Sequence, residues 1–331
     1  YKPMIMDQLK VYTYNLKHFM QWGTPEDLHE YKYWSDIFES LIEESEPPRH
    51  DGALMLPMAG KGSRFKAQGY HKIKPMIKVS GKPMFEQALN DLPLANLTRL
   101  VLRNDKELVE QVENKNTKDK KKYSIKILND DTDGQASTAL IGSKDINHES
   151  PITIGACDNG MIYKNKNFIE LMNDSSTDVI VWSASGYPGS IKNPKMYGWI
   201  EYDKSTKLIK SISVKEQLKD PKEDLIVVGT FTFKKQKYLI DSVNRMKKRK
   251  ALVNSEYYID MAINDSIALN LKCRVFEIDK YICWGTPEDL NTFEYWQSCF
   301  HKWKSHRYSI YNDPNIQQDK LKELESQIYD K

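Results

Sequence analysis

The sequence predicts an α/β fold built on a Rossmann-like, mixed but mainly parallel sheet with flanking helices. The first observation is a regular alternation of predicted strands and helices from Ala53 onward, which is typical of a parallel sheet covered on both faces. The second is a later group of strands without intervening helices, which predicts a smaller antiparallel lid sheet. The length of 331 residues suits one large domain with extensions.

The predicted elements follow a simple order. Strands are expected at 53–58, 98–102, 124–128, 151–156 and 178–184, and helices near 84–91, 104–113, 135–144 and 166–173. The antiparallel group is expected at 198–202, 207–213 and 225–233. Because ligands of such sheets bind at the carboxyl ends of the strands, we expect the functional residues in the loops that follow them.

Composition narrows the classes of partner. The 49 basic residues nearly balance the 46 acidic ones, so no overall field marks a nucleic-acid binder. No apolar run reaches the roughly 18 to 20 residues of a membrane span. The four cysteines lack a C-x-x-C spacing, which favours a reducing, cytoplasmic location.

A short unit occurs twice in the chain. Residues 22–28 read WGTPEDL, and so do residues 284–290, which lie 262 positions later (284 minus 22). Counted over 13 positions from each tryptophan, the copies share 9 residues. Since residues 11–20 alternate as residues 273–282 do, we expect each copy to be a strand, a turn and a helix. The threonine of each turn should cap its helix, with proline at the first helical position.

A full α/β domain lies between the two copies. We therefore interpret residues 1–46 as the C-terminal remnant of a preceding, similar domain, residues 51–304 as the complete domain, and residues 305–331 as a C-terminal helical extension. The two prolines at 47–48 mark the boundary. We expect the N-terminal segment to dock by burying its large aromatic side chains, Trp22, Tyr33 and Trp34, against the domain or another chain.

A glycine-rich loop follows the first predicted strand and reads MAGKGSRF from Met58 to Phe65. Its glycines let backbone N–H groups approach phosphate oxygens, and Arg64 adds a forked, charged donor. The loop matches neither G-x-G-x-x-G, which needs glycine at Phe65, nor the P-loop pattern G-x-x-x-x-G-K-[ST]. An ordinary tight turn is the alternative to a phosphate site. The residues expected to bind a nucleotide here are Ala59, Gly60, Gly62 and Ser63.

The loop belongs to a longer motif. Residues 56–84 read LPMAGKGSRFKAQGYHKIKPMIKVSGKPM and resemble the N-terminal signature of the sugar-phosphate nucleotidyltransferases, also called nucleotide-sugar pyrophosphorylases. The resemblance implies that the loop wraps a triphosphate, and that Arg64 and Lys74 act as catalytic residues by neutralising its charge. It continues in the family's order over residues 52–300.

Two further motifs resemble the nucleotide-binding half of that family. Gly134-Gln135-Ala136 resembles the turn that reads the nucleobase edge, with a plain helix N-terminus as the alternative. Asp158 follows a predicted buried strand and resembles the magnesium-binding aspartate, with a solvated turn acid as the alternative. A hard cation between carboxylate and phosphate oxygens suits that placement, so the resemblance implies Mg²⁺ as the cofactor.

The acceptor side is implied by three segments. Tyr197-Gly198 resembles the segment that lines the acceptor site, and Gly229-Thr230 resembles a strand of the acceptor pocket. Lys215-Glu216 stands where the family has Glu-Lys, so Lys215 is the candidate that holds the acceptor phosphate and the third catalytic residue. A lysine on a surface strand is the alternative.

One position departs from the family pattern. Many members carry a second metal-binding aspartate two residues before the last Gly-Thr, and Cys283 occupies that position here. Cysteine is a poor ligand for magnesium, which selects oxygen. The second ligand is then Glu256 or Asp260, or the metal is held by Asp158, phosphates and water.

Taken together, the motifs imply an enzyme that joins a nucleoside triphosphate to a phosphorylated sugar or other small phosphate acceptor and releases pyrophosphate. The Gly69-Tyr70 and Gly134-Gln135-Ala136 variants resemble bacterial members from capsule and surface-polysaccharide pathways. Two alternatives stay open: a nucleotide-sugar-dependent glycosyltransferase, and a non-catalytic nucleotide-binding regulatory copy. The sequence is also compatible with a homo-oligomer.

Overall fold

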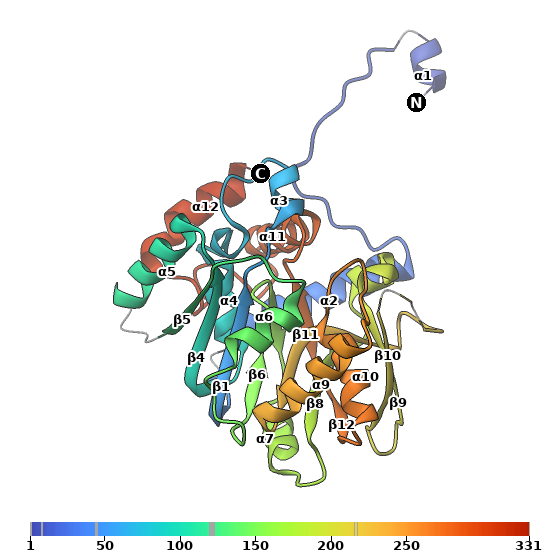
Figure 1. Ribbon diagram of the computed structural model, residues 1–331. Helices are drawn as coiled ribbons and strands as arrows, with labels where there is room; N and C mark the ends of the chain where they lie inside the picture. Colours follow the sequence, from blue (N-terminus) through green and yellow to red (C-terminus); the bar gives the residue numbers. More distant parts are fainter. Residues whose placement is uncertain are drawn as a thin grey trace.

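One mixed sheet runs through the part of the chain that the computed structural model describes, which comprises residues 2–7, 9–43, 46–118, 123–214, 216 and 218–330. The sheet has nine strands, of which seven follow the order β10-β9-β11-β6-β1-β4-β5, while β8 pairs with β11 and β12 pairs with β8. Figure 1 shows these strands with helices on either side. The predicted mixed sheet with flanking helices is therefore confirmed.

The parallel part of the sheet is centred on β1, which pairs in parallel with β4 and β6. Strand β5 pairs in parallel with β4. A separate parallel pair is formed by β8 and β12. The bounds are β1 Arg49–Met58, β4 Leu94–Arg103, β5 Tyr123–Leu128, β6 Ile152–Ile154, β8 Val179–Ala184 and β12 Cys273–Glu277.

The predicted antiparallel strands are present and continue this same sheet. Strand β11 pairs in antiparallel fashion with β6, β8 and β9, and β9 pairs with β10. Because β11 is shared, the antiparallel group is an edge of the main sheet rather than a separate layer above it. The bounds are β9 Gly198–Tyr202, β10 Ile209–Val214 and β11 Leu225–Phe233.

Each face of the sheet has its own hydrophobic core, because successive side chains of a strand point to opposite faces. In β1, Leu54 and Leu56 belong to one core, and Ala53 and Met55 belong to the other. The first core is covered by α2 Pro25–Leu41, α4 Met84–Asp91, α5 Lys106–Lys118, α7 Asn165–Asn173, α11 Pro287–Lys302 and α12 Leu321–Asp330. The second is covered by α6 Gln135–Gly142, α9 Gln236–Lys248 and α10 Ile259–Ala268.

The remaining elements are short. Two small antiparallel ladders join β13 to β7 and β2 to β3. The bounds of these strands are β7 Asn159–Ile162, β13 Lys280–Cys283, β2 Lys78–Val79 and β3 Lys82–Pro83. The short α-helices are α1 Lys2–Met6, α3 Ser63–Ala67 and α8 Pro188–Lys192. The 3-10 turns lie at Lys74–Met76, Pro194–Met196 and Gln318–Lys320. None of the helices in the described ranges is long and apolar enough to cross a membrane.

The caps of the repeated unit form as predicted. Thr24 and Thr286 both accept a hydrogen bond from the N–H three residues on, and the aspartate at that position bonds back to the threonine N–H. Pro25 and Pro287 begin the two helices. These caps depend on residues within one turn of the chain, which is why the sequence pattern alone predicts them.

The strand predicted for the first copy is wrong. Residues 11–20 adopt no strand, and residues 9–17 are all exposed in an arm that leads away from the domain (Figure 1). In the second copy β12 pairs with β8 and β13 with β7. A strand needs a neighbour for its backbone groups, and the first copy has none among the described residues.

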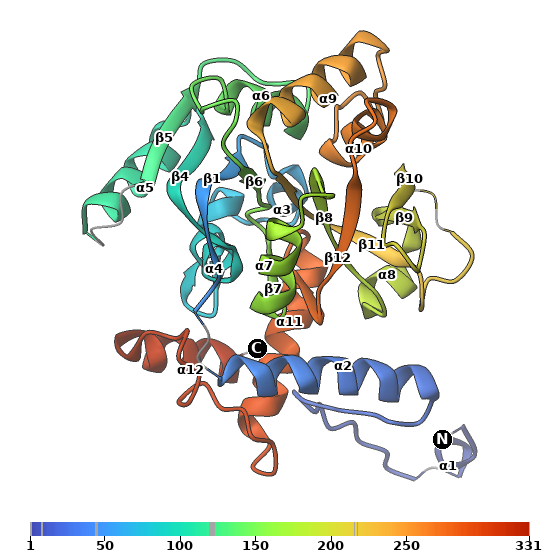
Figure 2. The same cartoon turned by 90° about the horizontal axis from the view of Figure 1, so that it is seen from below.

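Helix α2 packs firmly onto the domain, alongside α11 (Figure 2). Tyr33 and Trp34 are buried as predicted, at 5% and 1% exposure. Trp22 remains 51% exposed, so it is not buried against the domain, and its burial against another chain stays a prediction. The ring centroid of Phe38 lies 5.3 Å from that of Phe293 in α11, and this contact joins the two helices through one aromatic cluster.

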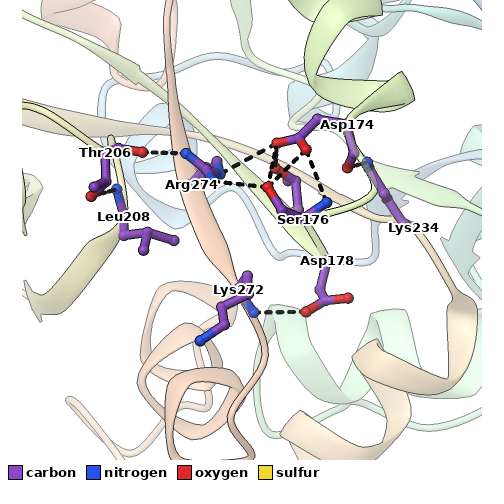
Figure 3. A network of polar contacts seen from close by, with 9 residues as sticks. Asp174, Ser176, Asp178, Thr206, Leu208, Lys234, Lys272 and Arg274 are labelled. Carbon is purple, nitrogen blue, oxygen red and sulfur yellow. Dashed lines mark hydrogen bonds and ion pairs between the residues drawn. The ribbon is translucent and has the colours of Figure 1, made fainter.

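A polar network fastens the edge of the sheet that β12 forms (Figure 3). Arg274 in β12 makes an ion pair with Asp174 at 3.5 Å, donates to the Ser176 hydroxyl at 3.0 Å and also donates to the carbonyl of Thr206. Hydrogen bonds from Thr177 and Ser176 hold the pKa of Asp174 well below its usual range. The network therefore joins three segments with charge-assisted bonds.

Asp91, at the end of α4, should make stability depend on pH. It accepts the Met161 N–H at 3.0 Å, and burial raises its pKa from 3.8 to about 7. The folded state thus binds this proton more tightly than the unfolded state, so the stabilisation is complete below the ordinary pKa and is lost as pH rises through about 7. This loss should appear as a fall in melting temperature between about pH 4 and pH 8, and we expect the fall to be shallower in Asp91→Asn. An equally steep fall in the variant would contradict the assignment.

Candidate active site

The glycine-rich loop leads from β1 into α3 through a left-handed residue. Gly62 has φ of 62° and sits at the start of α3. A Cβ atom at this position would lie 3.0 Å from the Cβ of Lys74. Glycine therefore meets two needs at once, because it adopts this backbone conformation freely and lets the Lys74 segment approach closely.

Lys74 and Asp158 form a close ion pair at the carboxyl end of the sheet. The Lys74 Nζ lies 2.5 Å from Asp158 Oδ2 and donates to the carbonyl of Gly285 at 3.0 Å. Burial lowers the pKa of Lys74, but the Asp158 carboxylate and neighbouring Cys157 raise it by more, so the pKa lies above its ordinary value. Lys74 is therefore a fixed cation at neutral pH.

A cavity of about 300 Å³ opens around this pair. Its walls come from the glycine-rich loop, the Lys74 turn, the start of α6, the segment after β6 and the turn after β13. The structure thus brings together predicted residues that are far apart in sequence. They are Gly60, Gly62, Ser63, Arg64, Lys74, Gln135, Asp158 and Glu256.

The Gly134 turn is held against the segment before α10. Gly134 has φ of 123°, and a Cβ atom there would lie 2.6 Å from both the N and the O of Tyr257. The Ala136 N–H donates to the Tyr257 carbonyl at 3.0 Å. This packing requires glycine and leaves Gln135 on the cavity wall, while Ala136 is buried behind it. Ala59 packs against the second core.

The two candidates for a second metal ligand lie in different places. Glu256 lines the same cavity as Asp158, whereas the Oδ2 of Asp260 lies 2.9 Å from the position of a Cβ on Gly198. The described residues contain no cluster of three or more histidine, cysteine or acidic side chains that would hold a metal by themselves. One or two carboxylates suit Mg²⁺ when substrate phosphates supply the other ligands.

Cys283 is buried beside the pair and does not act as an anion. Burial, followed by the charges of Asp289 and Asp158, raises the pKa of the Cys283 thiol, so it stays protonated. Its Sγ accepts the Gly285 N–H at 3.3 Å. We expect Cys283→Ser to keep turnover and its magnesium dependence, because a hydroxyl also accepts that bond and no metal is assigned to the sulfur. A loss of magnesium dependence in steady-state assays would contradict this.

A second cavity of about 440 Å³ adjoins the first at Arg64, which lines both. The predicted acceptor residue Tyr197 lies in its wall. Sequence reasoning missed most of its other lining residues, although the repeated WGTPEDL motif supplies four of them. These lining residues include Glu30, Trp34, Tyr187, Lys192, Thr286, Pro287, Glu288 and Asp289.

The other predicted acceptor residues that the structure describes do not line this cavity. Gly198 lies in β9 beside Asp260, and Gly229 has φ of 81° and lies beside Ala156. Thr230 is fully buried and lines neither cavity, because its side chain points toward Met161. The backbone carbonyl of Glu216 accepts the Ser213 hydroxyl. Lys215 lies outside the described residues.

Solved structures of nucleotide-sugar pyrophosphorylases share this architecture, so the chain has the sugar-phosphate nucleotidyltransferase fold. One is the nucleoside-diphosphate-sugar pyrophosphorylase from Vibrio cholerae RC9, with 19% identity and a TM-score of 0.59 over 72% of this chain and 98% of that one. Another is a UDP-glucose pyrophosphorylase solved with UDP-glucose, with 19% identity and a TM-score of 0.58 over 74% and 97%. The inositol-1-phosphate CTP transferase from T. maritima has 10% identity and a TM-score of 0.55 over 75% and 96%.

At the sequence level, the chain is 26% identical over 192 residues to a bifunctional protein GlmU from Methanococcus aeolicus. The match spans 58% of this chain and 42% of that protein, so the chain corresponds to less than half of its curated relative. No protein-family model matches the sequence.

Proposed function

We propose that this chain transfers a nucleotidyl group from a nucleoside triphosphate to a phosphorylated sugar or other small phosphate acceptor and releases pyrophosphate. The observation that carries the proposal is the cavity at the end of β1, where the glycine-rich loop, Arg64, Lys74 and Asp158 converge. The fold supports it, because structures with this fold include an inositol-1-phosphate CTP transferase and a UDP-glucose pyrophosphorylase solved with UDP-glucose.

In the proposed reaction, an oxygen of the acceptor phosphate attacks the α-phosphorus, and the bond from that phosphorus to the oxygen bridging the β-phosphate breaks. Such transfers depend on positioning and charge neutralisation. Backbone N–H groups of the glycine-rich loop would bind the triphosphate, and Lys74 would face it as a fixed cation. Arg64 lines both cavities and would orient the two phosphates toward each other. An acceptor phosphate is already ionised near neutral pH, so no general base is required.

Magnesium fits this site as a cofactor that binds together with the substrate, whose phosphates supply the remaining ligands. Asp158 and Glu256, which line the same cavity, would hold it, and the ion would supply further neutralisation of phosphate charge. Lys215 stays the proposed ligand of the acceptor phosphate, on the motif resemblance alone.

A pyrophosphate-release screen tests the proposal. Each common nucleoside triphosphate is combined with a panel of sugar, alditol and other small phosphates, with and without Mg²⁺. Release that requires both a triphosphate and an acceptor supports the proposed function. A glycosyltransferase would instead release a nucleoside diphosphate from a nucleotide sugar, and a regulatory copy would bind the triphosphate and release nothing.

We extend the proposal to the setting of the reaction. The motif variants support a role in making capsule or surface-polysaccharide precursors, and the four unpaired cysteines support a cytoplasmic location.

We also propose that residues 1–46 derive from a preceding domain of this fold, with residues 51–304 as the complete domain and residues 305–331 as its extension. Reading the coding sequence ahead of Tyr1 tests this, because an unrelated upstream sequence contradicts it.

A further inference from the structure

The two copies of the repeated unit contact each other reciprocally. The Tyr33 hydroxyl donates to the carbonyl of Tyr281 and accepts its N–H, both at 2.9 Å. The Tyr295 hydroxyl does the same to Phe19, donating to its carbonyl and accepting its N–H at 3.1 Å. Tyr33 and Tyr295 are equivalent in the repeat, and so are Phe19 and Tyr281, since 281 minus 19 is 262. The two contacts are therefore related by an approximate two-fold axis, as in an isologous interface.

The same exchange recurs in two cavities. The 440 Å³ cavity combines Trp34 of α2 with Asp289 from the first turn of α11. A cavity of about 770 Å³ combines Trp296 of α11 with Asp27 from the first turn of α2. These residues again differ by 262 (296 minus 34, and 289 minus 27). Each of the two helices thus lines a cavity together with the first turn of the other helix.

We propose that α2 serves as the terminal helix of a pseudo-two-fold partner and completes the acceptor pocket, with Glu30 and Trp34 as part of its wall. This inference rests on the proposed function. In this arrangement the reacting phosphate of the acceptor lies toward Arg64, and the opposite end of the acceptor lies against α2. The acidic side chains there are Glu30, Glu288 and Asp289, and carboxylates only accept hydrogen bonds. The acceptor therefore presents hydroxyl or amino donors to this wall.

Two contacts hold α2 against the opposite wall. Glu30 Oε2 lies 2.7 Å from Lys192 Nζ, and the Glu30 side chain is only 20% exposed. His29 Nε2 lies 2.9 Å from the carbonyl of Gly186, in the segment that leads into α8. Lys192 and Pro188, both in α8, also line the pocket. Moving α2 would therefore change the pocket's shape without touching the nucleotide cavity, to which α2 contributes no residue.

A kinetic comparison of two matched variants tests this. Glu30→Gln removes a carboxylate from the pocket wall, and we expect it to raise the acceptor KM by about 3- to 10-fold while leaving the nucleoside triphosphate KM unchanged. Glu26→Gln is the control, because Glu26 lies on the same helix and pairs with Lys222 at 3.2 Å without lining the pocket. Equal effects of the two variants, or an unchanged acceptor KM in Glu30→Gln, would overturn the inference while leaving the proposed function intact.

Hydrogen exchange gives a readout that needs no turnover. The amides of Tyr281 and Phe19 should both be protected, Tyr33→Phe should release only Tyr281, and Tyr295→Phe only Phe19. Rapid exchange at Phe19 in the unmodified protein would overturn the two-fold pairing. If no acceptor supports pyrophosphate release, the proposed function fails, and this measurement still decides whether α2 sits as the partner helix.

Discussion

Lys74→Ala is expected to lower turnover by at least about 100-fold, the loss typical of a donor that stabilises developing charge. The Lys74 ammonium is partly buried, fixed by Asp158 and the Gly285 carbonyl, and faces the cavity proposed for the triphosphate. Its loss also leaves the Asp158 carboxylate without that partner, so the melting temperature should fall. Steady-state pyrophosphate release and a thermal melt separate the two effects.

Arg64→Ala is the cleaner companion to Lys74→Ala, because Arg64 is exposed and its removal should not change stability. We expect a loss of turnover of the same order. Lys78→Ala serves as the control, since this lysine pairs at the surface with Glu323 and lines neither cavity of the proposed site. Unchanged turnover in Lys74→Ala or Arg64→Ala would remove that residue from the site.

Asp158→Asn is expected to abolish magnesium-dependent turnover, with a loss of more than about 100-fold. The variant should fold, because an amide oxygen still accepts the hydrogen bond from Lys74. Triphosphate affinity provides a second readout. In the unmodified protein Mg²⁺ should tighten triphosphate binding, and in the variant it should not. Full activity of Asp158→Asn would show that this carboxylate holds no metal.

The second metal ligand can be identified by the same measurement of how Mg²⁺ changes triphosphate affinity. Glu256→Gln should weaken the magnesium effect on triphosphate affinity, because Glu256 lines the cavity with Asp158. Asp260→Asn should leave it unchanged, because Asp260 lies against Gly198. The reverse result would assign the metal to Asp260.

Local features of this protein could be predicted from the sequence alone. The alternation of strands and helices predicts a sheet with a hydrophobic core on each face, and both cores are present. The Thr24 and Thr286 caps also form as the motif predicts. These features depend on side-chain periodicity and on hydrogen bonds within one turn, so neighbouring residues are sufficient to specify them. The glycine-rich loop is likewise a local pattern, and its four predicted nucleotide-binding residues are consecutive or nearly so in the chain.

Other features were decided only by tertiary structure, because they depend on which partner a segment meets. Residues 11–20 have the alternation of a strand but no neighbouring strand among the described residues. The separation of Glu256 from Asp260, and the burial of Thr230, result from how α10 and β11 pack. The wall that α2 adds to the second cavity brings Trp34 together with Asp289, which lies 255 positions later (289 minus 34). Periodicity specifies which side of an element is apolar, and only long-range packing specifies what that side meets.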